Sequence, residues 1–317
     1  MSLHVIIGAG PVGRALARLL SDRGEEVVVI TRSGSGPAQD GIRLRAADAT
    51  DATALAGHAR GAVALYNCAG PAYHRWATDW PPLGAAMIRA AEHTGAVLVS
   101  TGNLYGYGPV EGAMTEDLPL RPTSVKGRVR AELWTAALAA HDAGRIRTTE
   151  VRGSDYLGAG TISPFSVLVL PKVLAGRKAS VPADLDAPHS WTQVSDVAKL
   201  LAAVAVDEKA WGRPWHVPTA PALSIRALAE LAAESAGAPP ARVGTMPGYL
   251  LRLAGAVDPT AREMIEIQYQ LRKPFVLDSS AAVAAFGLEP APITDGLQEM
   301  ITAVPARQKS RRLGVSG

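Results

Sequence analysis

The chain has 317 residues, and its 48% hydrophobic and 19% charged content excludes a disordered protein and supplies enough apolar side chains for a sizeable core. No apolar stretch approaches the roughly eighteen residues of a membrane-spanning helix. A single cysteine, Cys68, excludes an internal disulfide, and no Cys/His cluster has the spacing of a metal site.

The net charge of +3 is concentrated at the end of the chain, where residues 305–317 carry four basic side chains and no acid. A nucleic-acid-binding protein usually has a basic face on its folded part, so we expect no nucleic-acid partner. The first apolar run starts at Leu3 without a basic leader or cleavage pattern, so we expect a cytoplasmic protein without membrane contact, whose partner is a small molecule.

The first half of the chain alternates between apolar strand-like runs and helix-like stretches. Residues 3–7 lead into a glycine turn, after which apolar residues recur at helical spacing until Gly24. This alternation is typical of an α/β fold with a doubly wound parallel sheet, the Rossmann fold. Further strands are predicted at 27–30, 42–47, 62–67, 97–100 and 148–151, and helices near 81–94 and 123–143.

A glycine-rich turn between the first strand and the first helix has the G-x-G-x-x-G spacing of dinucleotide-binding sites. The first glycine allows a tight turn, the second lets the backbone approach a pyrophosphate, and the third lets helix and strand pack closely. The helix N-terminus then presents free N–H groups and a positive dipole end to the phosphates. The residues predicted to bind the cofactor here are Gly8, Ala9, Gly10, Pro11, Val12 and Gly13.

The end of the second strand indicates which dinucleotide binds. An NAD site usually has an acid there for the ribose 2′-hydroxyl, whereas this chain has Thr31 and Arg32. A guanidinium binds a 2′-phosphate through paired hydrogen bonds. The sequence therefore favours NADP(H) over NAD(H), and a solvated surface arginine is the alternative for Arg32.

Taken in order, these motifs resemble the extended short-chain dehydrogenase/reductase family, which includes NAD-dependent epimerases and dehydratases. The resemblance runs from the glycine turn to Ala303. It implies that Asp48 and Ala49 bind the adenine side of the cofactor, and that the segment 67–70 (Asn-Cys-Ala-Gly) lines the adenosine through Asn67, Ala69 and Gly70. Residues 100–106 (Ser-Thr-Gly-Asn-Leu-Tyr-Gly) are similar to the hydroxyl-rich end of the family's fifth strand, in which Thr101 corresponds to the residue that hydrogen-bonds the reacting oxygen.

The chain departs from this family at the catalytic Tyr-x-x-x-Lys motif. In the matching stretch, Pro122, Ser124 and Gly127 align, but Lys126 stands at the tyrosine position and Arg130 at the lysine position. In the family, the tyrosine transfers a proton and the lysine holds the nicotinamide ribose. Arg130 has the donors to hold ribose hydroxyls, but it stays charged and does not relay protons.

Three roles for Lys126 remain open from the sequence. Burial and the positive charge of Arg130, four residues away on one helix face, would favour a neutral amine that transfers the proton. Alternatively, Lys126 binds cofactor phosphate or an acidic substrate, or the family's chemistry has been lost.

The second half of the chain changes character after about residue 153, where prolines punctuate a mostly helical section. We interpret residues 1–155 as an NAD(P)-binding domain with return segments near 191–217. Residues 156–303 are predicted to form mainly a substrate-binding cap, and residues 304–317 a basic flexible tail. Helices are predicted to start near 195 and to span 224–236, 259–271, 279–286 and 294–303.

Several polar residues are weaker candidates for substrate contacts. Tyr105 and Tyr107 follow Thr101, and Tyr156 follows the sixth strand, so any of these phenols is a candidate to replace the missing tyrosine. Trp76, Trp80 and Trp134 are expected to be core or interface residues, and Tyr73 and His74 are weak pocket candidates. The residues predicted to contact the substrate are Asn103, Tyr105, Tyr156 and His189.

We therefore expect an NADP(H)-dependent oxidoreductase, or an epimerase- or dehydratase-like enzyme, that acts at a carbonyl or carbinol carbon of a small metabolite. Thr101 orients the reacting oxygen, Lys126 is proton donor or electrostatic stabiliser, and Arg130 positions the ribose. The alternative is an NAD(P)-binding protein without hydride transfer, such as a redox sensor or a non-redox biosynthetic enzyme. The family resemblance also implies a homodimer built with helix 123–143.

Overall fold

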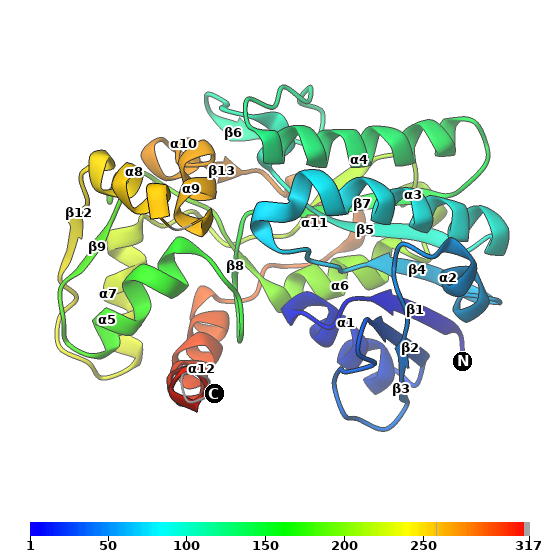
Figure 1. The fold of residues 1–317 in the computed structure, drawn as a ribbon, viewed down its shortest axis with the longest axis horizontal. Helices are drawn as coiled ribbons and strands as arrows, with labels where there is room; N and C mark the ends of the chain where they lie inside the picture. Colours follow the sequence, from blue (N-terminus) through cyan, green and yellow to red (C-terminus); the bar gives the residue numbers. More distant parts are fainter. Residues whose placement is uncertain (258, 314–317) are drawn as a thin grey trace.

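A parallel sheet forms the centre of the molecule in the computed structural model, which describes residues 1–257 and 259–313 (Figure 1). Among these residues, seven strands pair in the order β11-β7-β5-β4-β1-β2-β3, all of them parallel. Their apolar runs are buried because helices cover both faces of the sheet. The strands are β1 (Leu3–Ile7), β2 (Glu26–Thr31), β3 (Ile42–Ala46), β4 (Ala62–Asn67), β5 (Val97–Asn103), β7 (Thr148–Gly153) and β11 (Pro214–His216).

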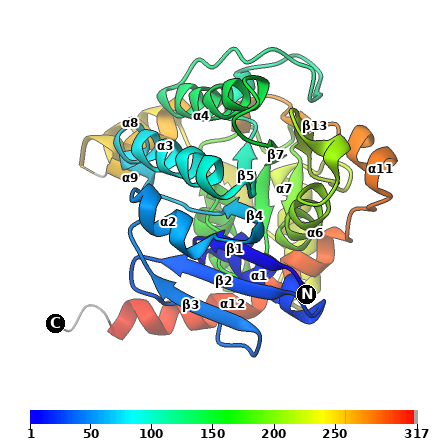
Figure 2. The same cartoon turned by 90° about the vertical axis from the view of Figure 1, so that its right-hand side faces the viewer.

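Two helical layers enclose the sheet, as Figure 2 shows along the strands. The order of the strands reverses between β1 and β4, and open α/β sheets usually bind their ligands beyond the carboxyl ends of the strands at such a point. One layer contains α1 (Pro11–Asp22), α6 (Val194–Val204) and α11 (Ser280–Phe286), and the other contains α2 (Ala52–His58), α3 (Trp76–Thr94) and α4 (Val125–Asp142). The predicted doubly wound α/β fold is confirmed.

The smaller part of the molecule lies beyond the carboxyl edge of the sheet and has a core of its own (Figure 1). Three small two-stranded sheets connect distant segments: β8 with β10, β9 with β12, and β6 with β13. The strands are β6 (Ala113–Met114), β8 (Asp155–Leu157), β9 (Ala179–Val181), β10 (Trp191–Gln193), β12 (Val243–Thr245) and β13 (Val276–Leu277). The helices are α5 (Leu170–Leu174), α7 (Ile225–Ser235), α8 (Gly248–Val257), α9 (Pro259–Glu266), α10 (Tyr269–Arg272) and α12 (Ile293–Leu313).

Some elements differ from the sequence expectation. Helix α3 begins at Trp76 rather than near residue 81, although Pro81 and Pro82 lie inside it. Both prolines are exposed, so water reaches the carbonyl groups that lack an N–H donor there. Helix α12 continues to Leu313, through most of the segment 304–317 that is predicted to be a tail, and residues 314–317 lie outside the described part. No described helix has the length and apolar character needed to cross a membrane.

Candidate functional site

The turn between β1 and α1 has the close packing that the glycine spacing predicts. Gly8 has a φ of +103°, and a Cβ on it would lie 2.5 Å from the carbonyl oxygen of Cys68. A Cβ on Gly13 would overlap the carbonyl oxygen of Gly8. In contrast, a Cβ on Gly10 would meet no atom of the described chain within 4 Å. Gly8 and Gly13 are therefore required by packing, whereas Gly10 leaves open space above the turn.

The N-terminus of α1 borders this open space. Gly10 is the N-cap residue, and within the described residues no side chain caps the helix. Pro11 occupies the first turn, which carries no acid. The unpaired N–H groups and the positive end of the helix dipole therefore remain available to an anion. These residues fit the pyrophosphate of a dinucleotide.

The end of β2 carries the residues that the sequence predicts to select between NADP(H) and NAD(H). The Thr31 hydroxyl donates to the carbonyl oxygen of Ser35 at 2.8 Å, which orders the loop. The Arg32 guanidinium is exposed and forms no hydrogen bond or ion pair with any described residue. Hydrogen bonds from Thr50 lower the pKa of Asp48, and the charge of Arg32 adds to this effect. Arg32 and Asp48 therefore lie near one another at this edge.

The end of β4 passes beside the glycine turn. Asn67 is 5% exposed, and its side-chain oxygen accepts a hydrogen bond from the N–H of Ala69 at 3.3 Å. A Cβ on Gly70 would meet no described atom within 4 Å, so the surface beyond this strand is also open. The Cys68 sulfur lies 3.6 Å from the Thr101 hydroxyl, which connects this strand to β5.

Arg130 and Thr101 meet at the end of β5. The Arg130 guanidinium donates to the carbonyl oxygen of Thr101 at 3.2 Å. It lies over the rings of Trp76 and Trp80, 4.6 and 4.4 Å from the ring centroids. Its buried Nε has no hydrogen-bond partner among the described residues, and burial lowers the pKa of this group, which still stays charged. Both tryptophans are buried, as is Trp134, which confirms that expectation.

Lys126 is bound by two acids of the cap. Its side chain is 2% exposed, and its Nζ forms ion pairs with Glu263 and, at 2.8 Å, with Glu266. The Glu266 carboxylate also accepts hydrogen bonds from the backbone N–H groups of Val125 and Lys126 at the start of α4. The Lys126 Nζ lies 4.4 Å from the centroid of the Tyr73 ring. A proton-transfer role would require a free Lys126 amine, but this amine is held between α4 and α9.

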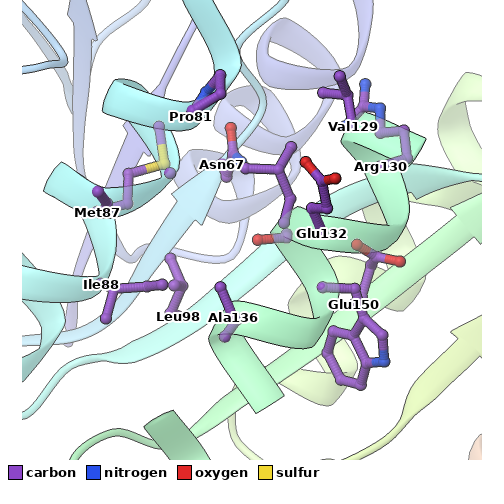
Figure 3. A pocket seen from close by; sticks show the side chains of 16 residues that line it. Asn67, Pro81, Met87, Ile88, Leu98, Val129, Arg130, Glu132, Ala136 and Glu150 are labelled. Atoms are coloured by element: carbon purple, nitrogen blue, oxygen red, sulfur yellow. The ribbon is translucent and has the colours of Figure 1, made fainter. Parts of the chain in front are cut away.

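Two cavities border this region. One, of about 330 Å³, is lined by Tyr73, His74, Lys126, Glu263 and Glu266 together with neighbouring residues, so both weak pocket candidates from the sequence do line a cavity. The second, of about 240 Å³, lies between α3 and α4, and Figure 3 shows Met87, Ile88 and Leu98 on its apolar side and Arg130 and Glu150 on its polar side.

Of the residues predicted to contact the substrate, some lie near Thr101, whereas His189 is buried elsewhere. Asn103 accepts the N–H of Tyr105 at 3.1 Å, and the Tyr156 hydroxyl donates to the carbonyl oxygen of Gly102 at 3.0 Å, so both lie beside Thr101. His189 is different because it is only 3% exposed and stacks on Trp191 and Phe275. Its Nε2 lies 3.3 Å from Asp155 Oδ2 without hydrogen-bond alignment.

Sequence reasoning did not identify Glu263 and Glu266. They lie on one face of α9, three residues apart, but no motif distinguishes them from acids on any surface helix. Their partner Lys126 is 137 and 140 residues away. The described residues contain no cluster of His, Cys, Asp and Glu side chains that could hold a metal ion.

Comparison with known families identifies one match. Residues 4–217 match the model of the "NAD dependent epimerase/dehydratase family". The matched segment runs from β1 to the end of β11 and contains the glycine turn, Thr101, Lys126 and Arg130. A search of curated proteins finds no match to the chain.

Solved structures share the fold over nearly the whole chain. The dTDP-glucose 4,6-dehydratase DesIV from Streptomyces venezuelae, with NAD and TYD bound, is 19% identical with a TM-score of 0.76, covering 97% of this chain and 98% of its own. The UDP-glucose 4-epimerase from Thermotoga maritima, with UDP-glucose, is 16% identical with a TM-score of 0.76 and coverage of 97% and 100%. The UDP-glucuronic acid 4-epimerase from Bacillus cereus, with NAD, is 15% identical with a TM-score of 0.76 and coverage of 96% and 99%.

Proposed function

The chain belongs to the NAD-dependent epimerase/dehydratase family and is an enzyme of the extended short-chain dehydrogenase/reductase type. From this premise we propose that it binds NADP(H) in preference to NAD(H) and acts at a carbonyl or carbinol carbon of a small metabolite. Sugar nucleotides are the proposed substrate class, because the similar dehydratase and epimerases are named for such substrates.

The observation that carries this proposal is the open cradle at the β1–α1 turn. Space above Gly10 and the uncapped N-terminus of α1 suit a dinucleotide pyrophosphate. The exposed guanidinium of Arg32 at the end of β2 suits a 2′-phosphate. A bound nicotinamide would supply or accept a hydride.

The protein's own residues act on the substrate oxygen and the ribose in this proposal. Thr101 holds the reacting oxygen by a hydrogen bond from its hydroxyl. Arg130, fixed by two indole rings and by the Thr101 carbonyl oxygen, positions the ribose and adds positive charge near the developing oxyanion. Lys126 acts through its charge, because its Nζ is bound by Glu263 and Glu266.

The test combines cofactor titration with turnover assays. Calorimetric titration with NADPH and NADH is expected to give tighter binding of NADPH. Turnover with either cofactor is then assayed on a panel of UDP- and dTDP-sugars and simple carbonyl compounds. Failure to bind either cofactor would overturn the proposal.

A second candidate function is an NAD(P)-binding protein without hydride transfer. The observation that favours it is the engagement of Lys126, at the family's tyrosine position, by two carboxylates. Cofactor binding without turnover on the full panel would support this candidate.

We further propose a cytoplasmic homodimer that uses α3 and α4. The cavity between these helices, with Met87, Ile88 and Leu133 among its apolar lining, supports a packing surface on this side. Light scattering at several protein concentrations measures the oligomeric state, and a monomer throughout would overturn the dimer.

A further inference from the structure

Three phenols surround the arginine that replaces the family's lysine. The Arg130 charge interacts with Tyr73, Tyr105 and Tyr156, which come from three different segments: the 3₁₀ turn before α3, the 3₁₀ turn after β5, and β8. Tyr73 and Tyr105 also pack near Trp76, at 5.0 and 6.3 Å between ring centroids. The family's tyrosine is absent from α4, but phenols from other segments lie in the same region.

The three phenols differ in their hydrogen-bond partners. Tyr156 donates its hydroxyl proton to the Gly102 carbonyl oxygen at 3.0 Å. Tyr73 donates its proton to the Tyr105 hydroxyl at 3.4 Å, a long bond of the kind that tightens when a ligand binds. The Tyr105 hydroxyl accepts this bond and also interacts with the side chain of Gln270.

We propose that Tyr105 is the group that exchanges a proton with the substrate oxygen and that Tyr73 is a positioning residue that stabilises its phenolate. This inference rests on the proposed function, because it concerns the proton that accompanies hydride transfer. Thr101 lies on β5, and Tyr105 begins the short 3₁₀ turn that follows this strand, two residues after Asn103. Both side chains therefore come from one short segment, and we place both of them at the reacting oxygen.

The charges around Tyr105 come from several packed elements. The pKa of Tyr105 is raised to about 12, mainly by burial and also by the charge of Asp155 on β8. The hydrogen bond from Tyr73 and the charge of Arg130 on α4 lower it. Tyr269 on α10 also faces Tyr105. A hydrogen bond with Gln270 lowers the pKa of Tyr105 as well, and the three groups that lower it favour the phenolate, as a proton-transfer role requires.

The proposed step balances as follows. The substrate carbonyl carbon would receive a hydride from the reduced nicotinamide of the proposed cofactor, which would be oxidised. The electron pair of the C=O π bond moves to the oxygen, and that oxygen takes the Tyr105 proton to give an alcohol. The Tyr105 phenolate that remains accepts the hydrogen bond from Tyr73 and faces the Arg130 charge. Oxidation of an alcohol runs in reverse, with Tyr105 receiving the proton.

The cavity beside Lys126 provides a route by which water restores the proton. Tyr73 lines this cavity of about 330 Å³, and so do Glu263 and Glu266, whose side chains are 27% and 23% exposed. In this proposal a proton passes from the cavity to Tyr73 and along its hydrogen bond to Tyr105. The positive charge of the Lys126 Nζ, which lies over the Tyr73 ring, disfavours the binding of another cation in this cavity.

The kinetic test uses Tyr105→Phe and Tyr73→Phe with Tyr249→Phe as the matched control, because Tyr249 is 62% exposed on α8. Tyr105→Phe is expected to lower kcat by roughly 10²- to 10⁴-fold, with NADPH affinity unchanged. Tyr73→Phe is expected to lower kcat by only about tenfold, and to move the rise of alcohol oxidation with pH to higher pH, because the phenolate loses a donor. Full turnover by Tyr105→Phe in an active enzyme would overturn the inference.

A spectroscopic titration tests the same pairing without turnover. The ultraviolet difference spectrum of tyrosinate is recorded against pH for the wild type and each variant. Tyr105→Phe is expected to remove a group that titrates before Tyr73 and Tyr156, whose pKa values burial raises further. Tyr73→Phe is expected to move the Tyr105 midpoint upward. If the Tyr105 midpoint does not move in Tyr73→Phe, the pairing of these two tyrosines is contradicted. This result is independent of cofactor binding and turnover, so it is distinguishable from a failure of the proposed function.

Discussion

Arg32 is the residue on which the proposed preference for NADP(H) depends, because its exposed guanidinium forms no hydrogen bond or ion pair with another described residue. A free guanidinium loses no existing ion pair when it binds a phosphate, so the full charge-assisted contact adds to affinity. We predict that Arg32→Ala weakens NADPH binding by roughly 1.5–3 kcal/mol and leaves NADH binding unchanged. Calorimetric titration of the wild type and of Arg32→Ala with NADPH and NADH measures this difference. Equal affinity of the wild type for NADPH and NADH would contradict it.

Lys126 is the residue at which sequence reasoning left the most alternatives. If Lys126 were the proton donor, Lys126→Met would lower kcat by roughly 10²- to 10⁴-fold. Its ion pairs with Glu263 and Glu266 favour a role in holding α9 against α4. We therefore predict that Lys126→Met raises KM, while kcat changes by less than about tenfold. Lys126→Arg keeps the charge and is the control, and steady-state kinetics separate the two parameters.

The β1–α1 turn shows how one element combines packing with binding. Gly13 approaches the Gly8 carbonyl oxygen so closely that α1 packs directly against β1. Gly10, three residues earlier, has open space at its Cα. Two glycines of one motif therefore serve different purposes, and substitution by alanine separates them.

We predict that Gly13→Ala lowers the free energy of unfolding by roughly 1–3 kcal/mol, because the new methyl group forces the turn apart. Gly10→Ala is expected to cost at most about 1 kcal/mol, the usual loss at an N-cap position, but to weaken NADPH binding because the methyl group occupies the phosphate space. Denaturant unfolding and calorimetric titration of both variants provide the comparison. Weak binding by Gly13→Ala alone would refute this division of roles.

At the scale of the whole molecule, a buried polar network connects the sheet to the cap. Tyr107 and His216 are bonded at 2.8 Å, and Arg152 donates to the Tyr107 hydroxyl at 2.7 Å and to Glu150 at 2.6 Å. His216 Nδ1 lies 2.8 Å from the carbonyl oxygen of Asp278 beyond β13. Because Nδ1 donates to this carbonyl, Nε2 accepts from Tyr107, so the network requires neutral His216.

This requirement makes stability depend on pH. Burial lowers the pKa of His216, and also that of His4, below the unfolded value of about 6.5. The unfolded chain therefore binds more protons below that pH, and the stability present above it is lost as pH falls toward the folded pKa. We predict a falling denaturant midpoint between about pH 7 and pH 5, with a shallower slope in His216→Gln. An equal slope in wild type and variant would exclude His216 as the cause.

Local patterns were sufficient for the sheet, the glycine turn and most helices. Periodicity and turn residues depend on neighbours a few positions apart, so β1 to β5, β7 and α1 could be predicted from residues alone, whereas the two-residue strand β6 was not predicted. Helices α2 and α8 were not predicted, because short amphipathic segments give weak periodic signals.

The candidate site also contains features that follow from local patterns and features that depend on long-range packing. The sequence by itself determined the close-packed glycine turn, because the turn is a contiguous motif, and the resemblance to the family's contiguous motifs singled out Thr101, Lys126 and Arg130. Only the tertiary structure decided that Lys126 is bound by acids more than 130 residues away, that Tyr73 donates to Tyr105, and that His189 is buried. These outcomes depend on how α9 and the cap pack against α4, and long-range packing leaves no periodic or spaced pattern in the chain.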